Sequence, residues 1–201
     1  MEKSDFYSSI GLFVRKNFLD DDLCVRIRSE MLSSDGRPAH FVRKDKNLLD
    51  ENIRRTMEKH TSKATKTLIN DKLSSIKGEL EDYFDMKLSR SQGPKFLYYK
   101  EGDFFQRHYD KGMSTDNPET VKERKVSTVI FLNSETDELE NSSYTGGSLI
   151  IYGVMKDPRF KSYGFRLIGA TGMLLAFRSD LLHEVIPVKE GVRYTVVDWF
   201  V

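Results

Sequence analysis

The chain has 201 residues, which is enough for one domain with a sizeable apolar core. Its 32 basic and 31 acidic side chains give a formal charge of +1, which excludes both the basic field of a general nucleic-acid binder and the acidic excess of a disordered tail. The single cysteine, Cys24, excludes an intramolecular disulfide framework and a metal site built from several thiolates.

The N-terminal part, residues 1–93, predicts mainly helices. Its first residues are too polar for a signal peptide and no run is long enough to span a bilayer, so we expect a soluble, cytoplasmic protein without a membrane partner. Asp20 to Asp22 are suited to cap a helix that continues to Leu32. Apolar residues recur every three or four positions over Thr61–Phe84, which predicts an amphipathic helix. Between these helices, Gly36–Thr56 is polar and basic and predicts a loop that can include a short strand.

After Pro94 the sequence changes to short runs of β-branched and aromatic residues, separated by Gly, Asn, Asp and Ser. The runs are KFLYYK, FFQRHYD, KVSTVIFLN, GSLIIYG, FRLIG, GMLLAF, LHEVIPV and VRYTVVDWFV. This pattern is typical of an antiparallel sandwich or jelly roll. Two long polar separators, Lys111–Arg124 and Asn133–Thr145, are of the kind that forms functional lids or is disordered. We therefore predict one α+β, mainly β, domain over residues 1–201. Residues 94–201 form a double-stranded β-helix (a cupin-like jelly roll), and residues 1–93 pack a helical layer on its outside.

The run FFQRHYD places a histidine and a carboxylate on one face of a strand, because side chains alternate. His108 and Asp110 would both point inward, where they need a partner; a surface strand with a solvated aspartate is the ordinary alternative. His183 adds a second histidine from a later strand-like run. Two histidines and one carboxylate are the donor set that binds Fe(II) and leaves coordination positions open. For His183 alone, a core histidine bonded to the backbone is the alternative.

Arg193 begins the last strand-like run and shares one face of it with Thr195, Val197 and Trp199. If this face is also the face that His183 uses, the guanidinium is buried and needs an anion. A carboxylate bound by two parallel hydrogen bonds is its natural partner. That carboxylate belongs either to a ligand or to an Asp or Glu of the chain.

The HYD motif, His183 and Arg193, in this order on β-like segments, resemble the Fe(II)- and 2-oxoglutarate-dependent dioxygenases, and among them the prolyl 4-hydroxylase-like group. The resemblance covers residues 98–201 and extends to YKEGDFFQRHYD and to the glycine pair of GGSLIIY. It implies that His108, Asp110 and His183 are the iron ligands. It also implies that Arg193 binds the distal carboxylate of 2-oxoglutarate, so that these four residues form the catalytic site.

The same resemblance implies further site residues. Tyr99 matches a tyrosine that forms a hydrogen bond in the cosubstrate pocket, and Leu149, Val185 and Trp199 match apolar residues of that pocket. Arg124 matches an arginine that the oxygen-sensing members place close to substrate. A solvated loop arginine is the alternative for Arg124.

Two departures from the family pattern qualify the resemblance. Collagen-modifying members usually carry lysine where Arg193 stands, so the chain looks more like the oxygen-sensing and bacterial hydroxylases. The oxygen sensors have tyrosine at the position of Phe131 and another near Phe105. Phenylalanine keeps the shape but removes two hydroxyl donors, which would weaken cosubstrate binding.

The implied reaction is hydroxylation of an unactivated C–H bond with Fe(II), O2 and 2-oxoglutarate, which is released as succinate and CO2. Ascorbate is a candidate additional cofactor, and the implied substrate is a prolyl residue in a protein or peptide. A free amino acid or another small molecule is the main alternative substrate. A nucleic-acid demethylase is disfavoured by the balanced charge, although RPAHFVRKDK is locally basic. A non-enzymatic cupin-like binding module is the remaining alternative, but it would not need Arg193.

Overall fold

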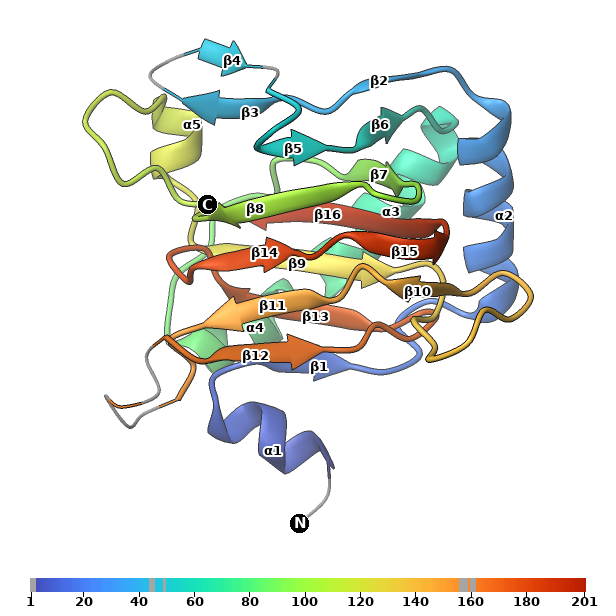
Figure 1. Ribbon diagram of the computed structural model, residues 1–201. Coiled ribbons are helices and arrows are strands. Elements are labelled where there is room, and N and C mark those ends of the chain that lie inside the picture. Colours follow the sequence, from blue (N-terminus) through green and yellow to red (C-terminus); the bar gives the residue numbers. More distant parts are fainter. Residues whose placement is uncertain (1–2, 44–45, 49, 156–158, 160–161) are drawn as a thin grey trace.

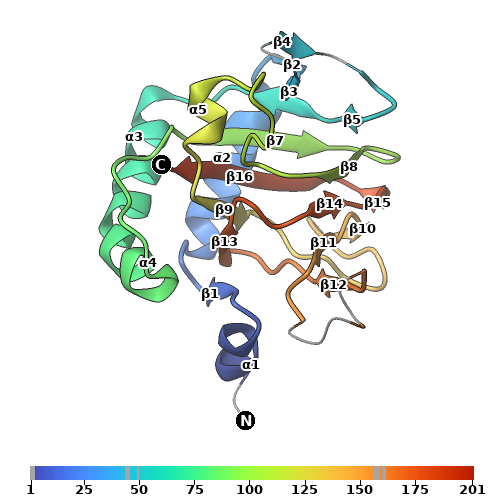
Figure 2. The ribbon, with the colours of Figure 1, turned by 90° about the vertical axis from the view of Figure 1, so that its left-hand side faces the viewer.

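The structure is a computed structural model that describes residues 3–43, 46–48, 50–155, 159 and 162–201. Two antiparallel sheets face each other in it, and helices cover the outer face of the larger sheet (Figures 1 and 2). The larger sheet contains, in spatial order, β1 (Phe13–Arg15), β13 (Leu174–Arg178), β9 (Val126–Phe131), β16 (Arg193–Phe200), β7 (Lys95–Tyr99), β6 (Met57–Lys59) and β2 (Gly36–Pro38). The smaller sheet contains β12 (Gly164–Leu167), β11 (Leu149–Tyr152), β14 (His183–Val185), β8 (Phe104–His108) and β5 (Arg54–Arg55). Two further pairs join β10 (Tyr144–Gly146) to β15 (Val188–Gly191), and β3 (Phe41–Arg43) to β4 (Lys46–Leu48).

The helices are α1 (Lys3–Ser9), α2 (Asp21–Ser33), α3 (Lys63–Ser75), α4 (Lys77–Phe84) and the short α5 (Glu119–Lys122). Asp20 caps α2 as predicted, because its carboxylate accepts a hydrogen bond of 2.7 Å from the Leu23 amide. The helix predicted over Thr61–Phe84 is two helices, because the backbone leaves the helical path at Ile76, which ends α3 and begins α4.

Strand alternation divides the apolar residues into two cores. On β13, Leu174 and Ala176 face the helices, while Leu175 and Phe177 face the smaller sheet. The outer core joins these strands to apolar residues of α2, α3 and α4: Leu23, Cys24, Ile27, Met31, Ile69, Leu73 and Leu80. The predicted helical layer on the outside of the sandwich is thus formed by α2, α3 and α4, which lie along the outer face in Figure 2.

The N-terminal part also supplies strands, which the sequence analysis underestimated. The segment Gly36–Thr56, predicted as a loop that can include a short strand, contains β2, β3, β4 and β5, and β6 follows directly. Strands β6 and β2 extend the larger sheet beyond β7, and β5 extends the smaller sheet beyond β8. These strands are two or three residues long, which is too short for a periodic pattern to show in the sequence.

The two long polar segments lie at the ends of strands. Lys111–Arg124 follows β8 and contains α5, while Asn133–Thr145 follows β9 and runs into β10. In the described ranges no helix is long and apolar enough to cross a bilayer.

Candidate metal centre

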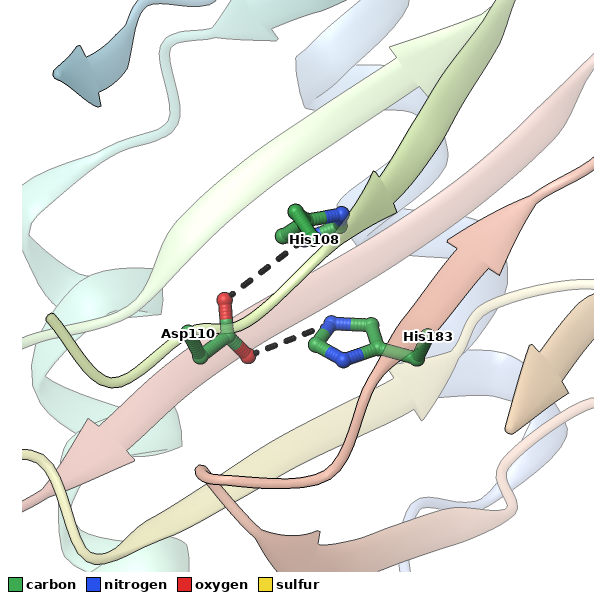
Figure 3. Close-up of side chains that lie close together, drawn as sticks. All are labelled: His108, Asp110 and His183. Carbon is green, nitrogen blue, oxygen red and sulfur yellow. Dashed lines mark ion pairs between the residues drawn. The ribbon is translucent and has the colours of Figure 1, made fainter. Parts of the chain in front are cut away.

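The two histidines of the predicted triad come together because β8 pairs with β14. His108 is the last residue of β8 and His183 the first of β14, and the antiparallel register places them opposite each other. Asp110 lies two residues beyond the end of β8. Figure 3 shows its carboxylate facing both imidazole rings.

The two nitrogens of each imidazole ring have different neighbours. Each Nδ1 lies close to a backbone carbonyl oxygen: His108 at 2.8 Å from that of Gln106, and His183 at 2.9 Å from that of Leu181. A carbonyl oxygen can only accept, so each Nδ1 donates a hydrogen bond to it, which leaves each Nε2 as the atom directed at Asp110 and available to a metal ion. The Nε2 atoms lie 3.7 Å (His108) and 3.5 Å (His183) from the two carboxylate oxygens of Asp110 (Figure 3).

The protonation states of the group suit a metal ion. Burial and the neighbouring His183 lower the pKa of His108, which keeps its imidazole neutral. Burial acts to raise the pKa of Asp110, but His183, His108 and Arg124 outweigh it, so this pKa is lowered and the carboxylate stays ionised. One donor atom from each residue lies within 4.8 Å of the other two. Neutral imidazoles and a carboxylate suit Fe(II), and a set of only three donors leaves positions open.

Aromatic side chains fix the orientation of both imidazoles. The Phe105 ring stacks on His108 with centroids 3.5 Å apart and an interplanar angle of 20°. The Phe177 ring meets His183 edge-on at 4.9 Å. Phe105, where the resemblance pointed to a missing hydroxyl, therefore supports the first iron-ligand candidate by packing.

Arg193 is a buried cation without a carboxylate partner. Only 2% of its surface is exposed, and its guanidinium lies against the rings of Tyr99 (5.0 Å) and Phe131 (5.3 Å). Its one side-chain hydrogen bond, to the Thr195 hydroxyl, is long at 3.4 Å, and its Nε has no partner. No ion pair between described residues involves Arg193, so none of the described Asp and Glu side chains is its salt-bridge partner. The guanidinium still needs an anion.

A buried polar atom without a partner, the hydroxyl of Tyr144, lies near Arg193, whose charge acts on it. One carboxylate oxygen of Glu135 is also buried without a partner, while its other oxygen binds Ser148 and Arg166. A Cβ atom on Gly147 would lie 3.3 Å from both the Tyr144 ring and the Arg193 Cδ, so these side chains crowd the same glycine. Burial raises the pKa of Tyr144 to about 12, which keeps its hydroxyl a donor.

One cavity of about 170 Å³ is lined by both the candidate iron ligands and Arg193. The structure brings together in its wall every residue that the sequence analysis named for the site: His108, Asp110, His183, Arg193, Tyr99, Leu149, Val185, Trp199 and Arg124. Arg124 is half-buried rather than freely solvated. Its guanidinium lies 3.8 Å from the centre of the Trp199 ring and donates to the Asp110 carbonyl at 3.3 Å and to Gln92 at 2.9 Å.

The cavity wall also contains residues that the sequence analysis missed, chiefly Arg54, Lys95 and Thr128. Lys95 had a signal, because strand alternation places it on the same face of β7 as Tyr99. Arg54 had none, because β5 is only two residues long and reaches the site through its pairing with β8.

The comparisons with known proteins agree with this geometry. Residues 94–201 match the family model of the 2OG-Fe(II) oxygenase superfamily. A PKHD-type hydroxylase of Prochlorococcus marinus is 25% identical over 178 residues, which cover 78% of this chain and 72% of that protein. A PKHD-type hydroxylase of Shewanella oneidensis is 31% identical over 107 residues, but the matching stretch covers 53% of this chain and only 41% of that protein.

Two solved structures share the fold over almost the whole chain. A Pseudomonas putida prolyl-4-hydroxylase superposes with a TM-score of 0.70 at 21% identity, covering 98% of this chain and 95% of its own. A prolyl hydroxylase from Trichoplax adhaerens, solved in complex with a hypoxia inducible factor peptide fragment, also gives 0.70, at 18% identity and 98% and 86% coverage. At these identities the likeness establishes the jelly-roll fold alone.

Proposed function

Because the chain belongs to the 2OG-Fe(II) oxygenase superfamily, we propose that it hydroxylates an unactivated C–H bond with Fe(II), O2 and 2-oxoglutarate. This proposal rests on one observation: the three metal donors and Arg193 line the same cavity. Three metal donors lie within 4.8 Å of one another, and the same cavity holds a buried arginine that lacks an anion. A metal site alone would not need the arginine, and a salt bridge would have given it a partner.

His108, Asp110 and His183 hold the metal in this proposal, and the backbone carbonyls of Gln106 and Leu181 orient the two imidazoles. Arg193 binds the distal carboxylate of 2-oxoglutarate. When bound, Fe(II) supplies the oxidative chemistry: O2 and 2-oxoglutarate are consumed, succinate and CO2 leave, and one oxygen atom enters the substrate C–H bond.

The remaining wall residues bind and shield the cosubstrate. Tyr99 lies against the Arg193 guanidinium, and Leu149 and Val185 are buried apolar residues of the same wall. They would exclude water from the space that holds Fe(II) and 2-oxoglutarate, which protects the reaction there from side reactions. We also place the reaction in the cytoplasm, where the lone thiol of Cys24 stays reduced.

For the substrate we propose a prolyl residue in a protein or peptide. The support is the hydroxylase naming of the relatives and the fold neighbour that was solved with a peptide bound. A second support is that Lys111–Arg124 begins directly after Asp110 and ends at Arg124, which lines the cavity, so this segment can contact a peptide.

Turnover with defined substrates tests the proposal. The protein is incubated with Fe(II), ascorbate and 2-oxoglutarate, together with proline peptides, free proline or a cell lysate. We expect peptides to stimulate succinate release and to gain the mass of one oxygen atom. Stimulation by free amino acids, but by no peptide or protein, would favour the small-molecule alternative and reject the peptide substrate.

A further inference from the structure

The solvent side of the cavity is lined by cations. Arg54 and Arg124 are half-buried and Lys95 is exposed, whereas Arg193 lies fully buried at the inner end of the cavity. We call Arg54, Lys95 and Arg124 the cationic rim. Asp110 is the single carboxylate in the described wall, and it belongs to the metal centre.

Among the described residues no carboxylate lies within ion-pair distance of a rim cation, although Asp110 and Asp198 act on Arg124, and Glu58 on Lys95, over longer distances. The Arg54 guanidinium stacks on Phe105 at 4.4 Å, donates to the His40 carbonyl at 2.8 Å, and leaves its buried Nε without a partner. Arg124 donates to a carbonyl and to a glutamine amide oxygen, both neutral acceptors. Nearby Asp198 is already bound by Ser91 Oγ at 2.5 Å and by two backbone amides.

The three rim cations lie close enough together to act on one another electrostatically. Lys95 and Arg124 both lie over the Trp199 ring, at 5.4 and 3.8 Å from its centre. Desolvation is the main cause that lowers the pKa of Lys95; the charge of Glu58 opposes it, and the charges of Arg124 and Arg54 add smaller lowering effects. Glu58 is itself paired with Arg37 at 3.3 Å. Like charges held together in a cavity cost stability unless an anion binds between them.

Binding of Fe(II) and 2-oxoglutarate does not neutralise the positive charge of the cationic rim. The two positive charges of Fe(II) and the one of Arg193 are balanced by Asp110 and the two carboxylates of 2-oxoglutarate. Beyond these charges, only Asp198 and Glu58 act on the three rim cations, and Glu58 is paired with Arg37, so the rim keeps a net positive charge in the loaded enzyme. Such a field attracts anions and excludes cations.

Resting on the proposed function, we propose that the substrate carries a carboxylate close to the carbon that is hydroxylated, and that Arg54, Lys95 and Arg124 bind it. An aspartate or glutamate beside the reacting residue of a peptide has this chemistry. So has the free carboxylate of an amino acid. A basic peptide does not fit.

Peptide binding tests the inference apart from turnover. Trp199 is the single tryptophan of the chain and lies under the rim, so its fluorescence reports occupancy. The protein is loaded with redox-inert Zn(II) and 2-oxoglutarate and titrated with three proline peptides that differ only in flanking aspartates, asparagines or lysines. We expect the aspartate peptide to bind about tenfold more tightly than the asparagine peptide, with an advantage that shrinks as salt is added, and the lysine peptide to bind weakest.

Strand β5 provides a matched control for the residues. Arg54 stacks on Phe105 and lines the cavity, whereas the next residue, Arg55, stacks on Phe104 at 4.9 Å and lies outside the cavity wall. We expect Arg54→Gln to weaken binding of the aspartate peptide about tenfold and Arg55→Gln to change it less than about twofold. Lys95→Gln should act in the same direction as Arg54→Gln. The inference would be overturned if Arg54→Gln and Arg55→Gln weakened peptide binding equally. It would also be overturned if the aspartate and asparagine peptides bound equally and free proline did not bind.

Two further binding experiments identify whether the carboxylate belongs to a side chain or to a free amino acid. They also separate the acidic substrate class from the prolyl substrate. Free L-proline compared with proline amide detects recognition of a backbone carboxylate, and a preference for L-proline that Arg54→Gln removes would support the inference in its amino-acid form. An aspartate peptide without proline tests the rim alone. If this peptide binds with the same dependence on Arg54 while no proline substrate is turned over, the acidic class stands and the prolyl substrate falls.

Discussion

His108 and His183 are direct partners across the antiparallel pair β8–β14, with ring centroids 4.2 Å apart. The backbone register therefore sets the distance between the two histidine ligands of the candidate metal centre. A shift of one residue would turn one of the rings to the opposite face of the sheet. The register shifts between His183 and Val185, so that Val185 pairs with Phe105. This pairing places the Phe105 ring, which stacks on His108, in the same strand pair.

We expect His183→Ala to abolish Fe(II) binding and turnover without unfolding the protein. Two donors would remain, while the apolar cores on both faces of the larger sheet would be unaffected. An anaerobic titration of Fe(II) with 2-oxoglutarate should show the weak visible charge-transfer band in the wild type only. His60→Ala is the control, because His60 is exposed and lies outside the cavity wall. A band of equal strength in His183→Ala would rule out the ligand assignment.

Arg193→Met should separate cosubstrate affinity from stability. The variant removes a buried charge that has no carboxylate partner, so the ligand-free protein should be as stable as the wild type or more stable. The apparent 2-oxoglutarate constant should rise roughly tenfold to a hundredfold, because hydrogen bonds to a charged group are lost. Arg193→Lys should restore part of the affinity, since it keeps the charge but loses the planar fork.

Thermal melts with and without 2-oxoglutarate, in the presence of Zn(II), measure both quantities at once. Arg178→Gln is the control, because Arg178 is paired with Asp180 at the surface. If Arg193→Met melts lower than the wild type and keeps its stabilisation by 2-oxoglutarate, the arginine is structural.

Gly147→Ala should cost both stability and 2-oxoglutarate affinity. The backbone at Gly147 has a φ of +64°, and an added Cβ would lie 2.9 Å from Val188 Cγ2 and 3.3 Å from Arg193 Cδ. Gly102 has a similar φ of +78° but open space around the Cβ position, so Gly102→Ala isolates the backbone cost, which is about 1 kcal/mol. Urea unfolding should show a loss for Gly147→Ala that exceeds the loss for Gly102→Ala by about 1 kcal/mol or more. Equal losses, with unchanged 2-oxoglutarate affinity, would mean that Arg193 is not held by this contact.

Cys24 should make stability depend on alkaline pH. The residue is fully buried in the outer core, and burial raises the pKa of its thiol from 9.0 to about 11. The unfolded chain releases this proton first, so its contribution to stability is complete below pH 9.0 and is lost as the pH rises towards about 11. The difference in unfolding free energy between the wild type and Cys24→Ala should shrink over that range. A constant difference would contradict a buried thiol, as would rapid alkylation of the folded protein near neutral pH.

The candidate site was largely predictable from the sequence because its residues stand in short local patterns. The spacing of His108 and Asp110 predicted that both point the same way, although β8 ends at His108 and Asp110 reaches the site from the bend that follows. Alternation on the last strand put Arg193 on the same face as Trp199. The structure finds these four residues in one cavity wall. A jelly roll was predictable for the same reason, since each of its longer strands has its own run of apolar residues.

The partner of Arg193 could not be predicted, because a sequence of balanced charge offers many carboxylates and does not say which are within reach. The folded chain leaves Arg193 without an ion pair to any of them in its described part, and brings near it the Tyr144 hydroxyl, which is buried and has no partner. That outcome depends on how β10, β11 and β16 pack together.

The cationic rim could not be predicted from the sequence either, because it also depends on contacts between distant segments. Arg54 and Arg124 stand 70 positions apart in the numbering, one on the short strand β5 and the other after α5, and neither belongs to a periodic pattern. They line the same cavity as Lys95 because β5 pairs with β8 and the segment after Asp110 folds back over Trp199. Local spacing determines which face a side chain occupies, whereas long-range strand pairing determines which other side chains share that face.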